Sequence, residues 1–222
     1  MLRCKQTALD RQDLAGLLRI HWQIGDVTLF SAFYTRIDQI FVLWGLVSVV
    51  IFATAQFAPV SWHAQAIAWT IATVLASAIM MRLAWYWVSV EQLRWVAYLW
   101  VSLMLGGLVV TDYSIFASWG LGLMNLCPLW LGLSALGYIA TGLGMRSRAF
   151  GWAGLLHGLG IAALPWIPGW QFGFTGIIVA GTLWLLAEVQ WDMRPPQVST
   201  VLTEAERAFN LQQHRLRERS TL

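Results

Sequence analysis

Charged side chains are scarce in this 222-residue sequence. Asp, Glu, Lys and Arg together make up 11% of it, whereas hydrophobic residues make up 58%. A soluble domain usually carries about 25% charged residues, because water must solvate its surface. The deficit indicates that much of the surface contacts lipid instead of water. The sequence therefore predicts an all-α, polytopic membrane helix bundle with the lipid bilayer as its first partner.

Cysteine is also rare, and the two that occur, Cys4 and Cys127, are poorly placed to pair. We therefore predict no disulfide. Walker-type phosphate loops and zinc-finger spacings are missing, which argues against a nucleotide-binding protein. Of the four histidines, only His157 is expected within the hydrocarbon, so neither a bis-histidine haem nor a metal site is predicted. We expect no cofactor.

Long apolar runs are abundant. A helix needs about 20 mostly apolar residues to cross the hydrocarbon core, and six runs qualify. The net charge of +3 is explained by topology without a nucleic-acid partner, because all fourteen Lys and Arg fall in alternate segments between these runs. Basic residues stay on the cytoplasmic side, so both termini are expected there, in a bacterial inner membrane. The predicted spans are Ile40–Ala58, Ala64–Tyr86, Trp95–Tyr113, Trp119–Met145, Ala149–Ile167 and Trp170–Gln190.

Three regions follow from these spans. Residues 1–38 form a cytoplasmic N-terminal segment in which Leu14, Leu17 and Leu18 recur at helical spacing, and this predicts a short amphipathic surface helix. The alternative is a loosely ordered tail. Residues 39–191 form the six-span membrane domain. Residues 192–222 form a charged cytoplasmic helix, which Thr203 and Glu206 are expected to begin as a capping box.

Tryptophan and glycine are unevenly distributed. Six tryptophans recur at similar intervals near predicted span starts and indicate three tandem helical hairpins, although the preference of Trp for membrane interfaces gives the same pattern. Those six are Trp44, Trp62, Trp100, Trp119, Trp152 and Trp170. Glycines gather in the last three spans and include the GxxxG pair Gly154 and Gly158. Small residues allow close helix packing, within the chain or against a membrane-protein partner that these spans or the tails would bind.

A few polar residues are expected inside the membrane: Asn125, Cys127, Ser134 and His157. Pro128 predicts a kink near Met124, where Asn125 would satisfy a freed backbone group. His157 is expected to be neutral and to face another helix across the glycine-rich seam, near Cys127 or Ser134. Asn125, Cys127 and His157 are the candidate binding residues.

Ser134 and His157 are the candidate catalytic pair. Residues 132–135, Gly-Leu-Ser-Ala, resemble the GxSx motif of rhomboid proteases over these four residues only. The resemblance implies intramembrane hydrolysis with Ser134 as the nucleophile. The pattern departs from rhomboids elsewhere, because His157 lies on the fifth span and span two lacks the expected His/Asn cluster.

Three classes of function remain after this reading. The scarcity of buried ionisable groups favours a non-catalytic scaffold, assembly factor or subunit of a membrane complex. A small permease for a neutral or aromatic solute is the alternative, and an intramembrane hydrolase using Ser134 and His157 is the second alternative. A polar cavity reaching the membrane midplane would favour the permease, and a Ser134–His157 hydrogen bond would favour the hydrolase.

Overall fold

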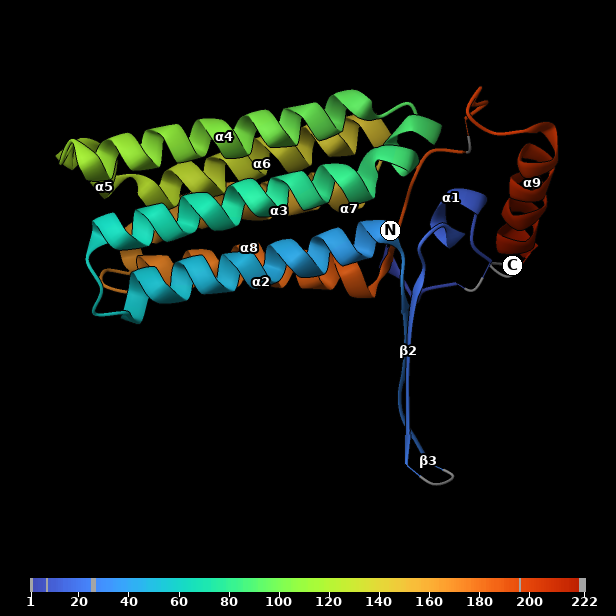
Figure 1. The fold of residues 1–222 in the computed structure, drawn as a ribbon, viewed down its shortest axis with the longest axis horizontal. Helices are drawn as coiled ribbons and strands as arrows, with labels where there is room; N and C mark the ends of the chain where they lie inside the picture. Colours follow the sequence, from blue (N-terminus) through green and yellow to red (C-terminus); the bar gives the residue numbers. More distant parts are fainter. Residues whose placement is uncertain (1, 7, 25–26, 196, 220–222) are drawn as a thin grey trace.

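The computed structural model describes residues 2–6, 8–24, 27–195 and 197–219. Its long helices run side by side along one axis (Figure 1). The elements, in chain order, are β1 (Leu2–Arg3), α1 (Arg11–Leu14), β2 (Leu18–Ile24), β3 (Val27–Tyr34), α2 (Arg36–Phe57), α3 (Trp62–Val90), α4 (Arg94–Phe116), α5 (Gly120–Met124), α6 (Leu126–Met145), α7 (Arg148–Ala163), the 3₁₀ turn η1 (Leu164–Trp166), α8 (Gln171–Glu188), β4 (Gln190–Trp191) and α9 (Glu204–Arg219).

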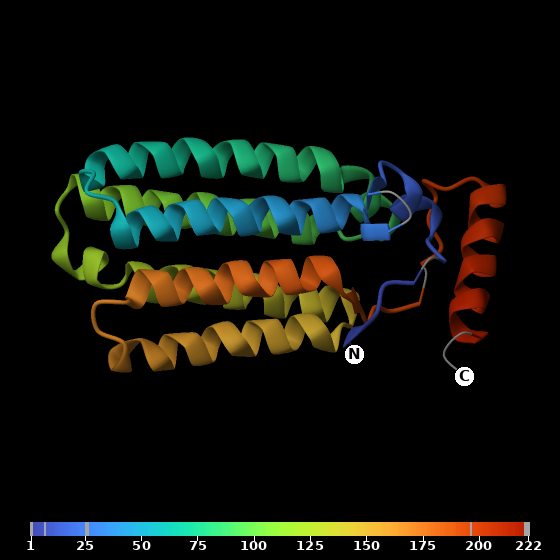
Figure 2. The same cartoon turned by 90° about the horizontal axis from the view of Figure 1, so that it is seen from below.

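Five of these helices are long and apolar enough to cross a membrane: α2, α3, α4, α6 and α8. The protein is therefore a multi-pass membrane protein by the length and composition of its helices. The helix α7 has 16 residues, and η1 continues it directly for three more. Its axis is aligned with those of the neighbouring helices (Figure 2).

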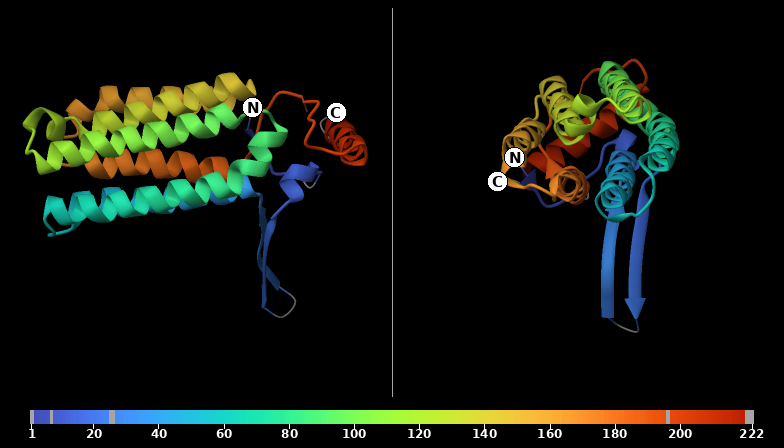
Figure 3. Two further views of the ribbon diagram at one scale, coloured as in Figure 1. Left: turned by 45° about the horizontal axis from the view of Figure 1, so that its top comes forward. Right: turned by 90° about the vertical axis from the view of Figure 1, so that its left-hand side faces the viewer.

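The long helices surround a common interior. The helix α2 packs between α3 and α8, α4 packs between α3 and α6, and α7 packs mainly on α6. The arrangement is visible down the bundle axis in Figure 3, right. Consecutive pairs α2/α3, α4/α6 and α7/α8 run antiparallel, which is compatible with the predicted hairpins. The strongest packing nevertheless joins α2 to α8 and α6 to α7, so the bundle is closed by contacts between different hairpins.

The fourth predicted span is broken where Pro128 predicted a kink. The chain leaves helical geometry at Asn125 (φ −109°, ψ 15°), between α5 and α6. Pro128 is the third residue of α6, where a backbone N–H would have no partner within the helix, so proline costs little there. The Asn125 side chain donates to the carbonyl of Leu121 at 2.8 Å. The break is therefore where the proline predicted it, but Asn125 bonds the carbonyl of Leu121 and not that of Met124.

Both ends of the chain lie at the same end of the bundle (Figures 1 and 2). There β1 pairs with β4, and α1 and α9 lie beyond the long helices. We call this region the terminal assembly: the described residues among 2–17 and 189–219. Thr203 and Glu206 begin α9 with reciprocal hydrogen bonds of 3.3 and 3.0 Å, so the predicted capping box is confirmed. Asp192 accepts hydrogen bonds from the backbone N–H groups of Arg148 and Ala149, which fastens the assembly to the start of α7.

The expected amphipathic surface helix is wrong beyond Leu14. The helix α1 is a single turn that ends at the extended Ala15, and Gly16 follows with a φ of +77°, a left-handed conformation that prevents the helix from continuing. From Leu18 the chain instead forms an antiparallel hairpin, β2–β3, which projects sideways from the bundle (Figure 1). The sequence contains the signal for this strand, because apolar and polar residues alternate from Leu18 to Ile24.

The glycine-rich seam between α6 and α7 is closely packed, as predicted for spans four and five, whereas α8 packs mainly on α2. A Cβ added to Gly142 of α6 would lie 3.0 Å from the backbone nitrogen of Gly151 in α7. A Cβ added to Gly154 of α7 would lie 3.0 Å from the carbonyl oxygen of Ala135 in α6. Only glycine permits backbones to approach this closely. Gly158, in contrast, has no atom within 4 Å of its added Cβ, so the two glycines of the GxxxG pair face different surroundings.

Candidate functional site

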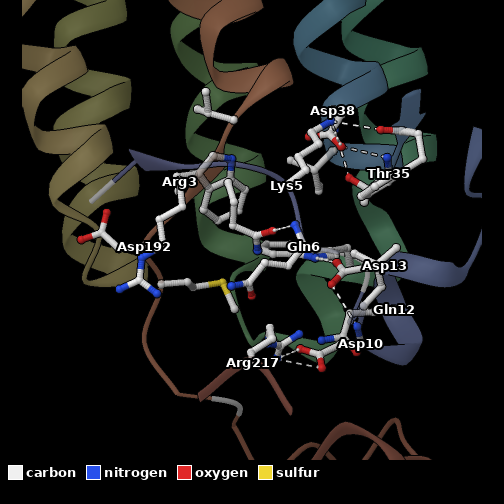
Figure 4. Close-up of a pocket in the computed structure, with 18 of the residues that line it drawn as sticks. Arg3, Lys5, Gln6, Asp10, Gln12, Asp13, Thr35, Asp38, Asp192 and Arg217 are labelled. Atoms are coloured by element: carbon white, nitrogen blue, oxygen red, sulfur yellow. Dashed lines mark hydrogen bonds and ion pairs between the residues drawn. The ribbon is translucent and has the colours of Figure 1, made fainter. Parts of the chain in front are cut away.

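A polar cavity of about 310 Å³ lies between the terminal assembly and the end of the bundle. Its walls come from the N-terminal segment, the start of α2, the end of α3, the segment after α8 and α9. Figure 4 shows the side chains that reach into it, with acidic groups beside basic ones. The labelled ones include Arg3, Lys5, Asp13, Asp38 and Arg217. The tertiary structure brings these residues together from opposite ends of the sequence.

Two buried ion pairs set the charge of this cavity. The Lys5 ammonium lies 2.9 Å from Asp38 Oδ2 and also donates to the Phe33 carbonyl at 3.1 Å. Arg217 donates to both carboxylate oxygens of Asp10, at 3.0 and 2.9 Å. Pairing of this kind is what permits ionised groups to be buried, because each charge replaces water for the other. These four charges therefore neutralise one another.

A chain of side-chain hydrogen bonds connects α9 to the end of α3. Asn210 Nδ2 donates to Gln12 Oε1, and Gln12 Nε2 donates to Glu91 Oε1, both at 2.9 Å. Beside it, Trp87 Nε1 donates to Asp13 Oδ1 at 3.0 Å. Burial, together with the nearby Asp10 and Asp13 charges, raises the pKa of Glu91 to about 7. Burial and the Asp10 charge likewise raise the pKa of Asp13 to about 6.

These raised values predict that the protein is more stable in mild acid. A carboxyl group whose pKa is higher in the folded state favours folding when protonated, and this contribution declines as the pH rises from about 4 to about 7. We expect a higher midpoint of thermal unfolding in detergent at pH 5 than at pH 8. Glu91→Gln should flatten this dependence and stabilise the protein at pH 8 by on the order of 1–2 kcal/mol. A dependence unchanged in Glu91→Gln would contradict the assignment.

A second, apolar cavity of about 160 Å³ lies inside the bundle. The helices α2, α3, α4, α6 and α8 line it, largely with aromatic and aliphatic side chains. Its aromatic walls include Trp44, Trp100 and Tyr138. Trp44 Nε1 has no hydrogen-bond partner within the described part of the chain. A hydrophilic solute would lose its hydration here with few groups to replace it, so the cavity suits apolar matter.

The two cavities share a wall. Ile37, Trp87 and Trp191 line both of them. Trp87 and Trp191 pack edge to face, with ring centroids 6.4 Å apart. The Trp87 ring faces the apolar side, and its N–H bonds to Asp13 on the polar side. The site is therefore amphipathic as a whole, with a polar compartment at the bundle end and an apolar one in the interior.

The candidate site residues that the sequence predicted do not lie together in the structure. Asn125 is exposed at the α5–α6 break, at the bundle end opposite the terminal assembly, so its expected place in the membrane interior is wrong. Cys127 is buried two residues later in the first turn of α6. Neither residue lines the polar or the apolar cavity.

His157 is completely buried, and its ring packs on Tyr138 of α6 with centroids 5.0 Å apart. The prediction that it faces another helix is confirmed. Its expected bond to Cys127 or Ser134 is wrong, because Nδ1 lies 2.8 Å from the Ala153 carbonyl oxygen of its own helix. Ser134 instead lines the apolar cavity. No hydrogen bond joins Ser134 to His157 among the described residues, so the geometry gives the serine no base.

The sequence reading missed the residues that form the polar cavity. Asp38 had a detectable signal, because Thr35 and Asp38 form a capping-box pattern just before an apolar run, and Asp38 Oδ2 accepts from the Thr35 N–H at 2.9 Å. Glu91, which belongs to the adjoining hydrogen-bond chain and lies between two spans, had no such signal. The described residues contain no group of three or more His, Cys, Asp or Glu placed to hold a metal ion.

Comparison with known proteins adds no family to this description. No protein-family model, curated protein or solved structure matches this chain.

Proposed function

We propose that the protein is a non-catalytic membrane protein that binds an amphipathic molecule, with its apolar chain in the bundle cavity and its polar end in the cavity under the terminal assembly. The observation that carries the proposal is the wall that the two cavities share, formed by Ile37, Trp87 and Trp191. Ligand sites commonly combine a largely apolar cavity with a few polar groups that fix orientation. Here the charged groups lie at one end only.

The buried ion pairs limit the chemistry of the polar end. Lys5 is paired with Asp38, and Arg217 with Asp10. A ligand would have to break such a pair to use these four charges, which is costly in a buried site. Because Arg3, Arg194 and Asp13 also line the cavity, a polar end that donates and accepts hydrogen bonds, and in particular a zwitterionic one, fits it best.

Native mass spectrometry after purification in mild detergent tests this proposal. We expect the protein to retain one amphipathic molecule. Ala84 is buried and lines the apolar cavity, so Ala84→Phe should fill the space and lower retention about tenfold, equivalent to about 1.4 kcal/mol. Ala78→Phe is the matched control, because Ala78 lies on the exposed side of the same helix. Retention that is equal in both variants, or absent from the unaltered protein, would overturn the proposal.

A second candidate function is the permease for a neutral or aromatic solute. The aromatic lining of a cavity at the centre of the bundle favours it. Uptake of an aromatic solute into proteoliposomes, lost in Ala84→Phe and kept in Ala78→Phe, would select transport over simple binding. A scaffold or complex subunit without a ligand is selected instead if the protein co-purifies with a partner but with no small molecule.

The proposal includes six spans, with α7 and η1 as the fifth, and both termini on the cytoplasmic side of a bacterial inner membrane. The even number of spans is supported by the two termini lying at one bundle end, where the basic segments also gather. The helix α4 ends at Phe116, so the outer loop begins at Ala117. Ser114 lies buried in the last turn of α4 and is therefore not part of this loop.

Cysteine labelling of intact cells checks this topology. In a Cys4→Ser background, Ala117→Cys should react with a membrane-impermeant maleimide, whereas Ala205→Cys should react only after the cells are permeabilised. Both positions are exposed in the structure, so access to the reagent depends on the side of the membrane. Reaction of both cysteines in intact cells would show that the six-span arrangement is wrong.

A further inference from the structure

The β2–β3 hairpin presents one apolar face and one mostly polar face, on which Phe33 lies opposite Arg19. Side chains alternate between the faces of a strand, so Leu18, Ile20, Trp22 and Ile24 share one face of β2. The pairing register shifts between Trp22 and Gln23, with the extra residue on β3, so β2 keeps its alternation. All four are exposed, Trp22 and Ile24 by 69% and 70%. His21 lies on the other face with Gln23, to which its ring is within hydrogen-bond distance at 3.3 Å. A two-stranded hairpin is only marginally stable alone, so its apolar face needs a surface to cover it.

The hairpin lies across the bundle axis. The strands are seen edge-on in Figure 1 and face-on in Figure 3, right, which looks along the bundle axis. The plane of the hairpin is therefore perpendicular to the long helices. Because these helices cross the membrane, that plane is parallel to the membrane surface.

Tyr34 shows which face is turned toward the membrane. It pairs directly opposite Leu18, and residues directly opposite in an antiparallel pair share a face. The Tyr34 hydroxyl donates to Glu188 Oε1 at 2.6 Å, and Glu188 is the last residue of the spanning helix α8. The apolar face therefore looks back along the bundle, and the face with Arg19 and His21 looks away from it.

The hairpin also leaves the bundle at the level where the membrane surface is expected. The strand β3 ends at Tyr34, and the spanning helix α2 begins at Arg36, two residues later. The apolar face thus begins where the lipid-facing surface of the bundle reaches its end, and the two surfaces are continuous. Tryptophan is enriched at this level of a bilayer, because its ring is amphipathic.

We propose that the hairpin lies as an interfacial anchor on the leaflet at the terminal-assembly end of the bundle, with Leu18, Ile20, Trp22 and Ile24 inserted among the lipids and Arg19 and His21 in water; that this leaflet is the cytoplasmic one rests on the proposed topology. The surface that covers the apolar face of the hairpin is the lipid leaflet itself. Interfacial elements of this kind typically bury their apolar face about 5–10 Å into the headgroup boundary. The anchor is independent of any ligand in the bundle.

Fluorescent labels on the two faces test this inference. The full chain, with Cys4→Ser and Cys127→Ala, receives single cysteines at Ile20 or Trp22 on the apolar face, and at Arg19 or His21 on the polar face. Each variant is labelled with a nitrobenzoxadiazole dye and reconstituted into vesicles of equal parts phosphatidylcholine and phosphatidylglycerol. Circular dichroism confirms that each variant keeps its helical content. Two positions on each face keep the test valid if one variant does not fold.

We expect the labels at Ile20 and Trp22 to emit at shorter wavelength and to lose intensity when lipids with nitroxide-labelled acyl chains are included. The labels at Arg19 and His21 should keep the emission of dye in water and respond to iodide in solution instead. Equal responses on the two faces would overturn the proposal. A blue-shifted label at Ile20 and Trp22 that nitroxide lipids do not quench would also overturn it, because a protein surface or a second copy would then cover this face.

Discussion

Lys5→Met is expected to lower the free energy of unfolding in detergent micelles by about 3–5 kcal/mol, the cost of breaking a buried ion pair by removing one partner. Lys5 and Asp38 have side chains that are only 14% and 7% exposed. Methionine preserves much of the volume of lysine and leaves the Asp38 carboxylate buried without its counter-charge. The pair also joins the N-terminal segment to the first turn of α2, so the terminal assembly should loosen with it.

The double variant Lys5→Met/Asp38→Asn separates the charge effect from lost packing. Asparagine keeps an oxygen that can accept from the Thr35 N–H, as Asp38 does at 2.9 Å, but it carries no charge. We expect the double variant to recover most of the loss, because an apolar or neutral replacement of a whole buried pair is often neutral. A double variant as unstable as Lys5→Met would contradict the charge explanation.

Arg148→Ala is the matched control for this experiment. Arg148 also forms an ion pair, with Asp192 at 3.2 Å, but its side chain is 76% exposed. Surface pairs contribute only about 0–1 kcal/mol, because water already solvates both charges. Unfolding of the three variants and the unaltered protein can be followed by circular dichroism during titration with a denaturing detergent.

Gly154→Val is expected to destabilise the bundle by about 1–3 kcal/mol, and more if α7 cannot shift. A Cβ at this position would lie 2.6 Å from Ile139 Cγ1 and 3.0 Å from the Ala135 carbonyl oxygen, both in α6. The isoleucine side chain can move, but the backbone oxygen cannot move without displacing the helix. The same unfolding titration measures the effect.

Gly158→Val, one helical turn later, should have little effect on unfolding, because no atom lies within 4 Å of the added Cβ. Valine has a slightly better helix propensity than glycine, so a small stabilisation is expected. The comparison also tests whether the GxxxG pair joins two copies of the chain. If Gly158→Val converted a dimer to a monomer in size-exclusion chromatography with light scattering, the internal assignment of this pair would be incomplete.

Much of the bundle could be predicted from local composition. Each long helix of the structure overlaps one of the predicted spans, because a run of about 20 apolar residues has few other stable arrangements in a membrane. The break before Pro128 was predictable for a similar reason, since proline removes a backbone donor wherever it occurs. The close approach at Gly142 and Gly154 follows from glycine having no side chain.

The amphipathic helix expected in the N-terminal segment rested on the helical spacing of only three leucines, and the structure does not contain it. Leu14, Leu17 and Leu18 fit a helix, but Gly16 adopts a positive φ between them. That conformation is stabilised by contacts outside the segment, including a hydrogen bond of 2.9 Å from Gln39 Nε2 to the Gly16 carbonyl. Short apolar patterns are ambiguous when distant residues determine the backbone.

Composition and local spacing were sufficient to predict a multi-pass membrane protein, basic residues gathered at one end, and close packing of the fourth span on the fifth, because each of these depends on residues near one another in the chain. The polar contacts of the terminal assembly depend instead on the three-dimensional arrangement of the chain. Lys5 meets Asp38, Asp10 meets Arg217 and Gln12 meets Glu91 across 33 to 207 residues, and no local pattern specifies such partners. The same holds for Ser134 and His157, which sequence spacing placed at similar depth. Depth follows from helix rise, but the direction of a side chain is set by how each helix packs against its neighbours.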